Sequence, residues 1–147
     1  MDYSELVLGL IIVALSMLGW VGQAITLFAP VTAVKLSLTE PQNEVDPAFY
    51  ADVRAEAIWD TLTLWTLPLA GVLLLIQNSL WPYFGMIGGG MFFYFSGRGI
   101  IARFEMLKHG IRIGTADKVK INIIFLALWG ILGIVTIIKA VFEINSF

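Results

Sequence analysis

Residues 55–79 read AEAIWDTLTLWTLPLAGVLLLIQNS, an apolar run that opens with two acids, Glu56 and Asp60. No charged residue follows Asp60 until after the run ends. A helix needs about 20 apolar residues to cross the hydrocarbon core of a bilayer. A single segment in lipid satisfies its own backbone groups only as a helix. The stretch therefore predicts a membrane-spanning helix over residues 55–76 that carries two carboxylates near one end.

The composition of the whole chain agrees with a membrane protein. Hydrophobic residues make up 59% and charged residues 14% of the 147 residues, whereas soluble domains carry about 25% charged residues. We therefore expect the lipid bilayer to surround the chain. The net charge of −2 offers no electrostatic attraction for nucleic acid. With no cysteine and a single histidine, His109, we expect no metal site, and the composition points to no particular cofactor.

The remaining apolar stretches predict the fold class. We expect an all-α single domain over residues 1–147, with four transmembrane helices in an antiparallel bundle and a long loop at residues 30–54. The predicted spans cover residues 6–29, 55–76, 80–104 and 118–142.

The lysines and arginines predict the orientation of this bundle. Eight of the nine lie between Lys35 and Lys120, on the side of the first and third connections. Because basic residues are retained on the cytoplasmic side, we expect loops 30–54 and 105–117 in the cytoplasm and both termini outside. We expect the membrane to be the plasma or cell membrane.

The short turn around Ser79 places acids and arginines at matching depths. Asp60 lies 79 − 60 = 19 positions before Ser79, and Arg98 lies 98 − 79 = 19 positions after it. Glu56 and Arg103 match in the same way, at 23 and 24 positions. Asp60 and Glu56 share one helix face, where like charges repel unless cations lie opposite. We therefore predict the ion pairs Asp60–Arg98 and Glu56–Arg103.

Polar side chains on the outer two spans lie at a similar depth and extend this layer. Gln23 and Thr26 are near the end of the first span, and Asn122 is near the start of the fourth. Such a layer either orients the helices as structural glue or marks a ligand or ion site. The predicted ligand-binding residues are Gln23, Glu56, Asp60, Arg98, Arg103 and Asn122.

The third span is rich in small residues. Gly85 and Gly89 form a G-x-x-x-G motif, and Ser96 and Gly99 follow on the same span. This spacing lets two helix backbones approach closely. The four residues are predicted either to pack helices within the chain or to form an oligomer interface.

Three tryptophans lie deep in the predicted spans: Trp20, Trp65 and Trp129. An indole N–H away from water needs a hydrogen-bond acceptor. We expect these side chains to pack in the core or to line an apolar pocket.

Three functional hypotheses remain open because the chain contains no recognisable catalytic motif. The first is a membrane protein whose polar layer binds a small ligand, a lipid head group or an ion. The second is an accessory or assembly subunit of a larger membrane complex. The third is a small membrane enzyme. We expect the chain to form a homo-oligomer or to be a subunit of a membrane complex, and of the three hypotheses we place ligand binding slightly ahead of assembly.

The enzyme hypothesis comes from a resemblance in layout. The length, the four spans, the long first loop and the stretch VRAEAIWDTLTLWTLP at residues 53–68 resemble the membrane-associated eicosanoid and glutathione metabolism family. The resemblance implies a membrane enzyme that binds glutathione. The asparagine and glutamate that this family places ahead of the proline are absent, since Trp59, Asp60 and Trp65 occupy that region. No catalytic residue is therefore assigned.

Overall fold

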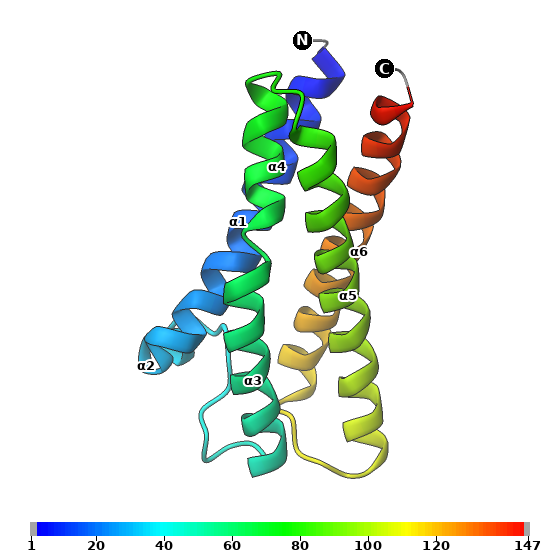
Figure 1. Cartoon of the computed structure of the whole chain (residues 1–147). Coiled ribbons are helices and arrows are strands. Elements are labelled where there is room, and N and C mark those ends of the chain that lie inside the picture. Colours follow the sequence, from blue (N-terminus) through cyan, green and yellow to red (C-terminus); the bar gives the residue numbers. More distant parts are fainter. Residues whose placement is uncertain (1–2, 146–147) are drawn as a thin grey trace.

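The computed structural model describes residues 3–145, which are helical except for short connections. Two consecutive helices, α3 and α4, continue one another, so the chain forms four long rods and one short helix (Figure 1). The helices are α1 (Tyr3–Phe28), α2 (Pro30–Lys35), α3 (Pro47–Thr63), α4 (Thr66–Leu75), α5 (Trp81–Lys108) and α6 (Ala116–Ile144).

The four rods run antiparallel to their neighbours along the chain (Figure 1). The start of α1, the α4–α5 turn and the end of α6 lie at one end of the molecule. The opposite end, called here the α2 end, holds α2, the start of α3 and the α5–α6 connection. The first and the last residues that the structure describes therefore lie at the same end of the bundle.

Three helices are long and apolar enough to cross a membrane: α1, the continuous α3–α4 rod and α6. They span 26, 29 and 29 residues, and at about 1.5 Å per residue each exceeds the roughly 30 Å of a hydrocarbon core. The α5 helix has 28 residues, but its glycines and Arg98 lower its mean hydropathy. The chain thus has the composition of a membrane protein in three of its rods.

The second rod begins earlier than the predicted residue 55. The backbone N–H of Ala48 donates to the Asp46 carboxylate over 3.0 Å, and Pro47 occupies the first helical position. An aspartate cap followed by proline is a strong helix start. The predicted loop at 30–54 is therefore too long, and it also contains the short helix α2.

Pro68 explains the break between α3 and α4. Proline has no N–H, so the carbonyl of Leu64 loses the donor it would have in a regular helix. That carbonyl receives a weak hydrogen bond of 3.4 Å from Leu67 instead. The helix breaks at Leu64 and Trp65, one turn before Pro68. The two halves of the rod can consequently take different directions.

Small residues bring α5 and α6 close together. A Cβ atom added to Gly89 would lie 2.7 Å from the carbonyl oxygen of Gly133, so the two backbones touch. Gly85 and Gly99 also face α6, and the Ser96 hydroxyl donates to the Leu126 carbonyl over 2.5 Å. All four predicted packing residues thus lie at a helix contact inside the chain. The oligomer interface stays a prediction.

The two long connections at the α2 end are joined to each other. Lys118 at the start of α6 forms a 2.7 Å ion pair with the buried carboxylate of Glu40, and the backbone N–H of Asp46 donates to the Arg112 carbonyl over 2.8 Å. A small apolar cluster lies beneath them, formed by Val45, Phe49, Ile113 and Val119. These contacts hold the segment before α3 against the bundle.

Candidate functional site

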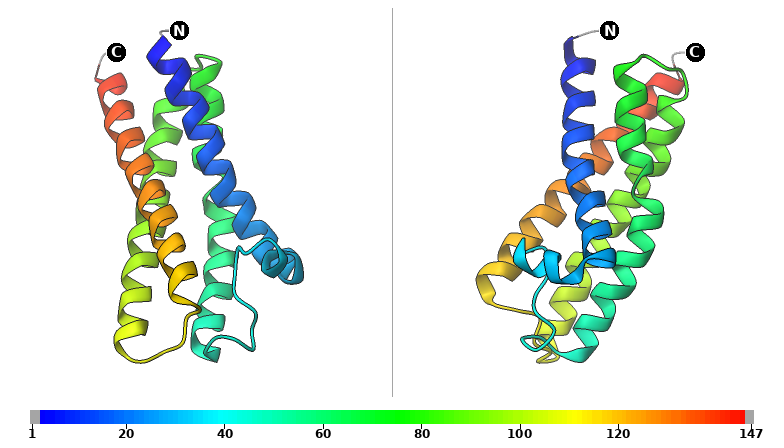
Figure 2. Two further views of the ribbon diagram at one scale, coloured as in Figure 1. Left: turned by 180° about the vertical axis from the view of Figure 1, so that it is seen from behind. Right: turned by 90° about the vertical axis from the view of Figure 1, so that its left-hand side faces the viewer.

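The α1 and α6 helices separate toward the α2 end (Figure 2). Where they still meet, the indole N–H of Trp129 on α6 donates to the Leu15 carbonyl on α1 over 2.8 Å. Gly19 continues this contact, since a Cβ atom there would lie 3.1 Å from Phe92 and 3.2 Å from Trp129. Beyond this point the helices diverge, and a pocket occupies the space between them.

The pocket has a volume of about 320 Å³ and draws its walls from every rod of the bundle. The segment after α2 closes part of it with Leu36, Ser37 and Leu38. The helical lining comes from α1 (Leu18, Gly19, Gly22, Gln23, Thr26), α3 (Val53, Glu56), α5 (Phe95, Arg103) and α6 (Ile121, Asn122, Phe125, Leu126, Trp129).

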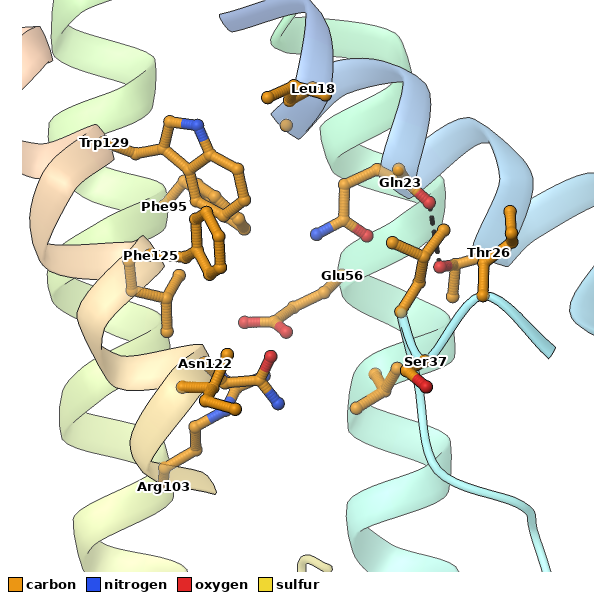
Figure 3. Close-up of a pocket in the computed structure, with 17 residues that line it drawn as sticks. Leu18, Gln23, Thr26, Ser37, Glu56, Phe95, Arg103, Asn122, Phe125 and Trp129 are labelled. Atoms are coloured by element: carbon orange, nitrogen blue, oxygen red, sulfur yellow. Dashed lines mark hydrogen bonds between the residues drawn. The ribbon is translucent and has the colours of Figure 1, made fainter. Parts of the chain in front are cut away.

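One half of the pocket is aromatic. The rings of Phe95 and Phe125 each lie 5.7 Å from the Trp129 ring, measured between centroids. The rings are tilted against one another, and Figure 3 shows the three side chains grouped on one side of the pocket. Contacts of this kind stabilise the rings and fix their positions. They form a rigid apolar wall on the side of the pocket where α1 and α6 meet.

The other half of the pocket is polar. Glu56 extends into its centre, with Gln23 on one side and Asn122 and Arg103 on the other (Figure 3). Four of the six predicted ligand-binding residues, Gln23, Glu56, Arg103 and Asn122, therefore line a single pocket. Asp60 and Arg98 are not part of its lining.

The predicted ion pairs Asp60–Arg98 and Glu56–Arg103 are both wrong. The Arg98 guanidinium instead binds two carboxylates of α3, those of Asp52 and Glu56. Sequence counting correctly brought α3 and α5 together at this depth, but it assigned the wrong partners. Asp52 was missed, although it lies four residues before Glu56 and hence on the same helix face.

The reach of the arginine side chain explains this difference. Asp52, Glu56 and Asp60 follow one another at intervals of one helical turn, about 6 Å apart along the axis. Arginine keeps its flexible stem along apolar surface and extends its charge toward water. Arg98 is 35% exposed and takes the two acids nearer the α2 end. A count of positions sets the depth of the backbone and leaves the direction of the side chain open.

Asp60 consequently has no cation within 4.0 Å among residues 3–145. The residue is 5% exposed, and its Oδ2 atom has no hydrogen-bond partner within the part of the chain that the structure describes. An unpaired polar atom in a buried place is costly. Asp60 faces the packed interior of the bundle, away from the pocket lining.

Arg103 also differs from the prediction, because no carboxylate lies within 4.0 Å of it among residues 3–145. Its guanidinium donates to the Gly99 carbonyl over 3.0 Å and lies 5.8 Å from the centre of the Phe49 ring. A guanidinium has five N–H donors. Most of the hydrogen-bonding capacity of Arg103 is therefore unused by the described protein.

The two amides in the pocket are unused in the same way. The side chains of Gln23 and Asn122 are half-buried and make no hydrogen bond to any described residue. Each amide offers two N–H donors and one carbonyl acceptor. The pocket thus presents donors and acceptors from three helices that the described residues leave free.

The deep tryptophans have two different roles. The indole of Trp20 donates to the Thr61 carbonyl and that of Trp65 to the Leu62 carbonyl, both over 2.9 Å. Neither lines the pocket, whereas Trp129 does. Trp20 packs against the core and Trp129 lines the pocket, as predicted, whereas Trp65 is 42% exposed and does neither. Each indole finds a backbone acceptor.

A charged side chain also holds the open end of α1. Arg54 on α3 donates to the carbonyls of Thr26 and Leu27, over 2.5 and 3.1 Å. The last carbonyls of a helix have no partner within that helix. Arg54 satisfies two of them and keeps the end of α1 attached to α3, so the pocket wall does not move away.

The chemistry available in the pocket is that of binding through charge and hydrogen bonds. Among the described residues, no group of three histidine, aspartate or glutamate side chains is arranged to hold a metal ion. No protein-family model, curated protein or solved structure matches this chain. Its function must therefore be inferred from the pocket itself.

Proposed function

We propose that the chain is a four-span integral membrane protein whose pocket at the α2 end binds a small ligand or lipid head group. One observation carries the binding proposal: polar side chains with unused hydrogen-bonding capacity, Gln23, Arg103 and Asn122, face one side of a pocket whose other side is aromatic. A concave, mostly apolar site with a few converging polar groups is typical of small-molecule sites.

The fourth span in this proposal is α5. Its 28 residues extend about 42 Å at about 1.5 Å per residue, enough for a hydrocarbon core. Four of the glycines that lower its hydropathy, Gly85, Gly88, Gly89 and Gly99, face α4 or α6 and do not require contact with water. Charged residues such as Arg98 and Arg103 lie toward the α2 end, where snorkelling to the interface is inexpensive. By the distribution of basic residues, that end faces the cytoplasm.

The test is to fill the pocket from within. A Cβ atom on Gly22 would meet its nearest neighbour, Leu38, only at 4.0 Å, so leucine at this position extends into the pocket without a backbone clash. Gly90 is the matched control, because a Cβ atom there meets nothing within 4 Å and the residue lies outside the pocket. Both variants replace a helical glycine by leucine.

The wild type, Gly22→Leu and Gly90→Leu are purified in a mild detergent, and mass spectrometry quantifies the small molecules and lipids that remain bound. We expect the wild type and Gly90→Leu to retain the same compound in a fixed ratio to protein. Gly22→Leu should retain at least about tenfold less, since most of the contact surface is lost. Equal retention by all three proteins would contradict the proposal.

A further inference from the structure

We propose that the pocket accepts the head group of a zwitterionic phospholipid carrying a primary ammonium, with the ammonium at Glu56 and the phosphate at Arg103. This inference rests on the binding function proposed above. It begins from the sign of the two charges, since the polar half contains one carboxylate from α3 and one guanidinium from α5. A ligand with a single charge of either sign would place it beside a like charge.

Glu56 has room for a second cation. One of its oxygens, Oε1, accepts from Arg98, and Oε2 makes no hydrogen bond within residues 3–145. The carboxylate is 9% exposed but reaches the centre of the pocket. An ammonium has three N–H donors, and one of them can bind Oε2 without displacing Arg98.

Arg103 supplies the complementary group. Its guanidinium is held by Gly99 and by the ring of Phe49, and it has no carboxylate partner in the described chain. Guanidinium and phosphate form strong, often bidentate, charge-assisted hydrogen bonds. Asn122 lies beside Arg103 in Figure 3 and can donate its amide N–H to the same phosphate.

The size of the pocket favours a membrane lipid over a molecule that is wholly enclosed. A volume of about 320 Å³ equals that of about ten water molecules at about 30 Å³ each. This holds a phosphoethanolamine group and the first carbons of its tail, but no complete acyl chain. On α1 and α6 the pocket is lined by three exposed apolar side chains: Leu18, Ile121 and Phe125. The remaining tail can leave between α1 and α6 along these side chains.

The head group is tested with three lysophospholipids that share one acyl chain and carry phosphoethanolamine, phosphocholine or phosphoglycerol. Native mass spectrometry measures their binding to the wild-type protein. We expect phosphoethanolamine to bind at least about tenfold more tightly than the others, because only it donates a charged hydrogen bond to Glu56. Choline has no N–H donor, and glycerol has no cation.

The role of Glu56 is separated from that of its ion pair by a matched variant. Asp52 also binds Arg98 but does not line the pocket. Glu56→Gln should reduce the preference for phosphoethanolamine to within about twofold, whereas Asp52→Asn should keep it, because only Glu56 contacts the ammonium. Loss of the preference in both variants would overturn the assignment of Glu56.

The role of Arg103 is tested in the same series. Arg103→Gln should weaken all three lipids by about tenfold, because each of them carries the phosphate. Arg112→Gln, at an exposed arginine of the α5–α6 connection, should leave them unchanged. If Glu56→Gln does not fold, the head-group proposal is decided by the binding of the three lipids to the wild type and to Arg103→Gln.

The two proposals fail differently. Equal binding of all three head groups to the wild type, together with its loss in Gly22→Leu, would refute only the zwitterionic head group. Equal binding to the wild type and Gly22→Leu would show that the pocket is not the binding site, and both proposals would fail.

Discussion

The α5–α6 and α1–α6 contacts use the same helix, α6, in opposite ways. Along α5, glycine faces glycine, and the backbones touch at Gly89 and Gly133. Along α1, the contact ends at Trp129 and Gly19, and the two helices separate beyond it. Close packing on one side of α6 and a pocket on the other therefore depend on which residues each neighbour presents.

The difference shows how a small bundle combines rigidity with a binding site. Backbones that approach closely gain van der Waals contact and leave no space for a ligand. Around the pocket, which is the open side, single side chains join the helices through hydrogen bonds and ion pairs. Arg54 joins α3 to α1, Arg98 joins α5 to α3, and Trp129 joins α6 to α1. Such bridges hold helices together at a distance, so the space between them remains available.

The largest effect is expected at the closed contact. Gly89→Leu would place a Cβ atom 2.7 Å from the Gly133 carbonyl oxygen, and neither backbone can move without separating α5 from α6. We expect the free energy of unfolding to fall by about 3 kcal/mol, at the upper end for overpacking. Unfolding in mixed micelles with increasing dodecyl sulfate measures it. Gly90→Leu is the control, and its unfolding free energy should stay near that of the wild type. Equal losses of stability in both variants would show that the loss does not come from the contact between Gly89 and Gly133.

An intermediate effect is expected at the ion pairs of the open side. Arg98→Gln leaves Asp52 and Glu56 without their cation, and removing one partner of a fully buried pair costs about 3–5 kcal/mol. Because Arg98 is 35% exposed, solvent reduces this cost, and we expect about 2 kcal/mol in the same unfolding experiment. Lys108→Gln removes an exposed pair with Glu105 and should have no measurable effect. A wild-type stability for Arg98→Gln would show that these pairs do not hold α3 to α5.

The smallest effect is expected where the two regions meet. Trp129→Phe removes the hydrogen bond to Leu15 and should lower the unfolding free energy by about 1 kcal/mol. Trp65→Phe is the matched control, because the indole N–H of Trp65 donates to the Leu62 carbonyl within the same rod and so forms no hydrogen bond between rods. Trp65→Phe should change stability by less than about 0.5 kcal/mol. If Trp65→Phe lowered the unfolding free energy more than Trp129→Phe does, the hydrogen bond of Trp129 would not be what links α1 to α6.

Much of the candidate site follows from residue positions along the helices. Gln23, Glu56, Arg103 and Asn122 were grouped by depth alone, and all four line the pocket. The matching depths of Glu56 and Arg103 follow from the short α4–α5 turn, since equal counts on each side give equal height, and those of Gln23 and Asn122 follow from their positions near the ends of their spans. Asp52 was missed because the second span was predicted to begin at residue 55. Asp46 as the N-cap and Pro47 at the first helical position already indicate an earlier start.

Other features could not be derived from counting. The partners of Arg98 depend on the direction of a long side chain, and the isolation of Asp60 follows from that choice. Leu36 and Ser37 line the pocket because the segment before α3 is held by Glu40 and Lys118, which are 78 positions apart. No local pattern predicts a contact of that separation.

The sequence by itself determined that the chain is helical, that three of its rods suit a bilayer, and that its polar groups gather toward one end. Apolar length and the height of each residue along a helix are local properties, and they can be counted. Only the tertiary structure decided that α1 separates from α6, that Arg98 prefers Asp52 and Glu56, and that no carboxylate among the described residues pairs with Arg103. Those outcomes depend on helix tilt and on the reach of side chains across the space between helices, which residue order does not specify.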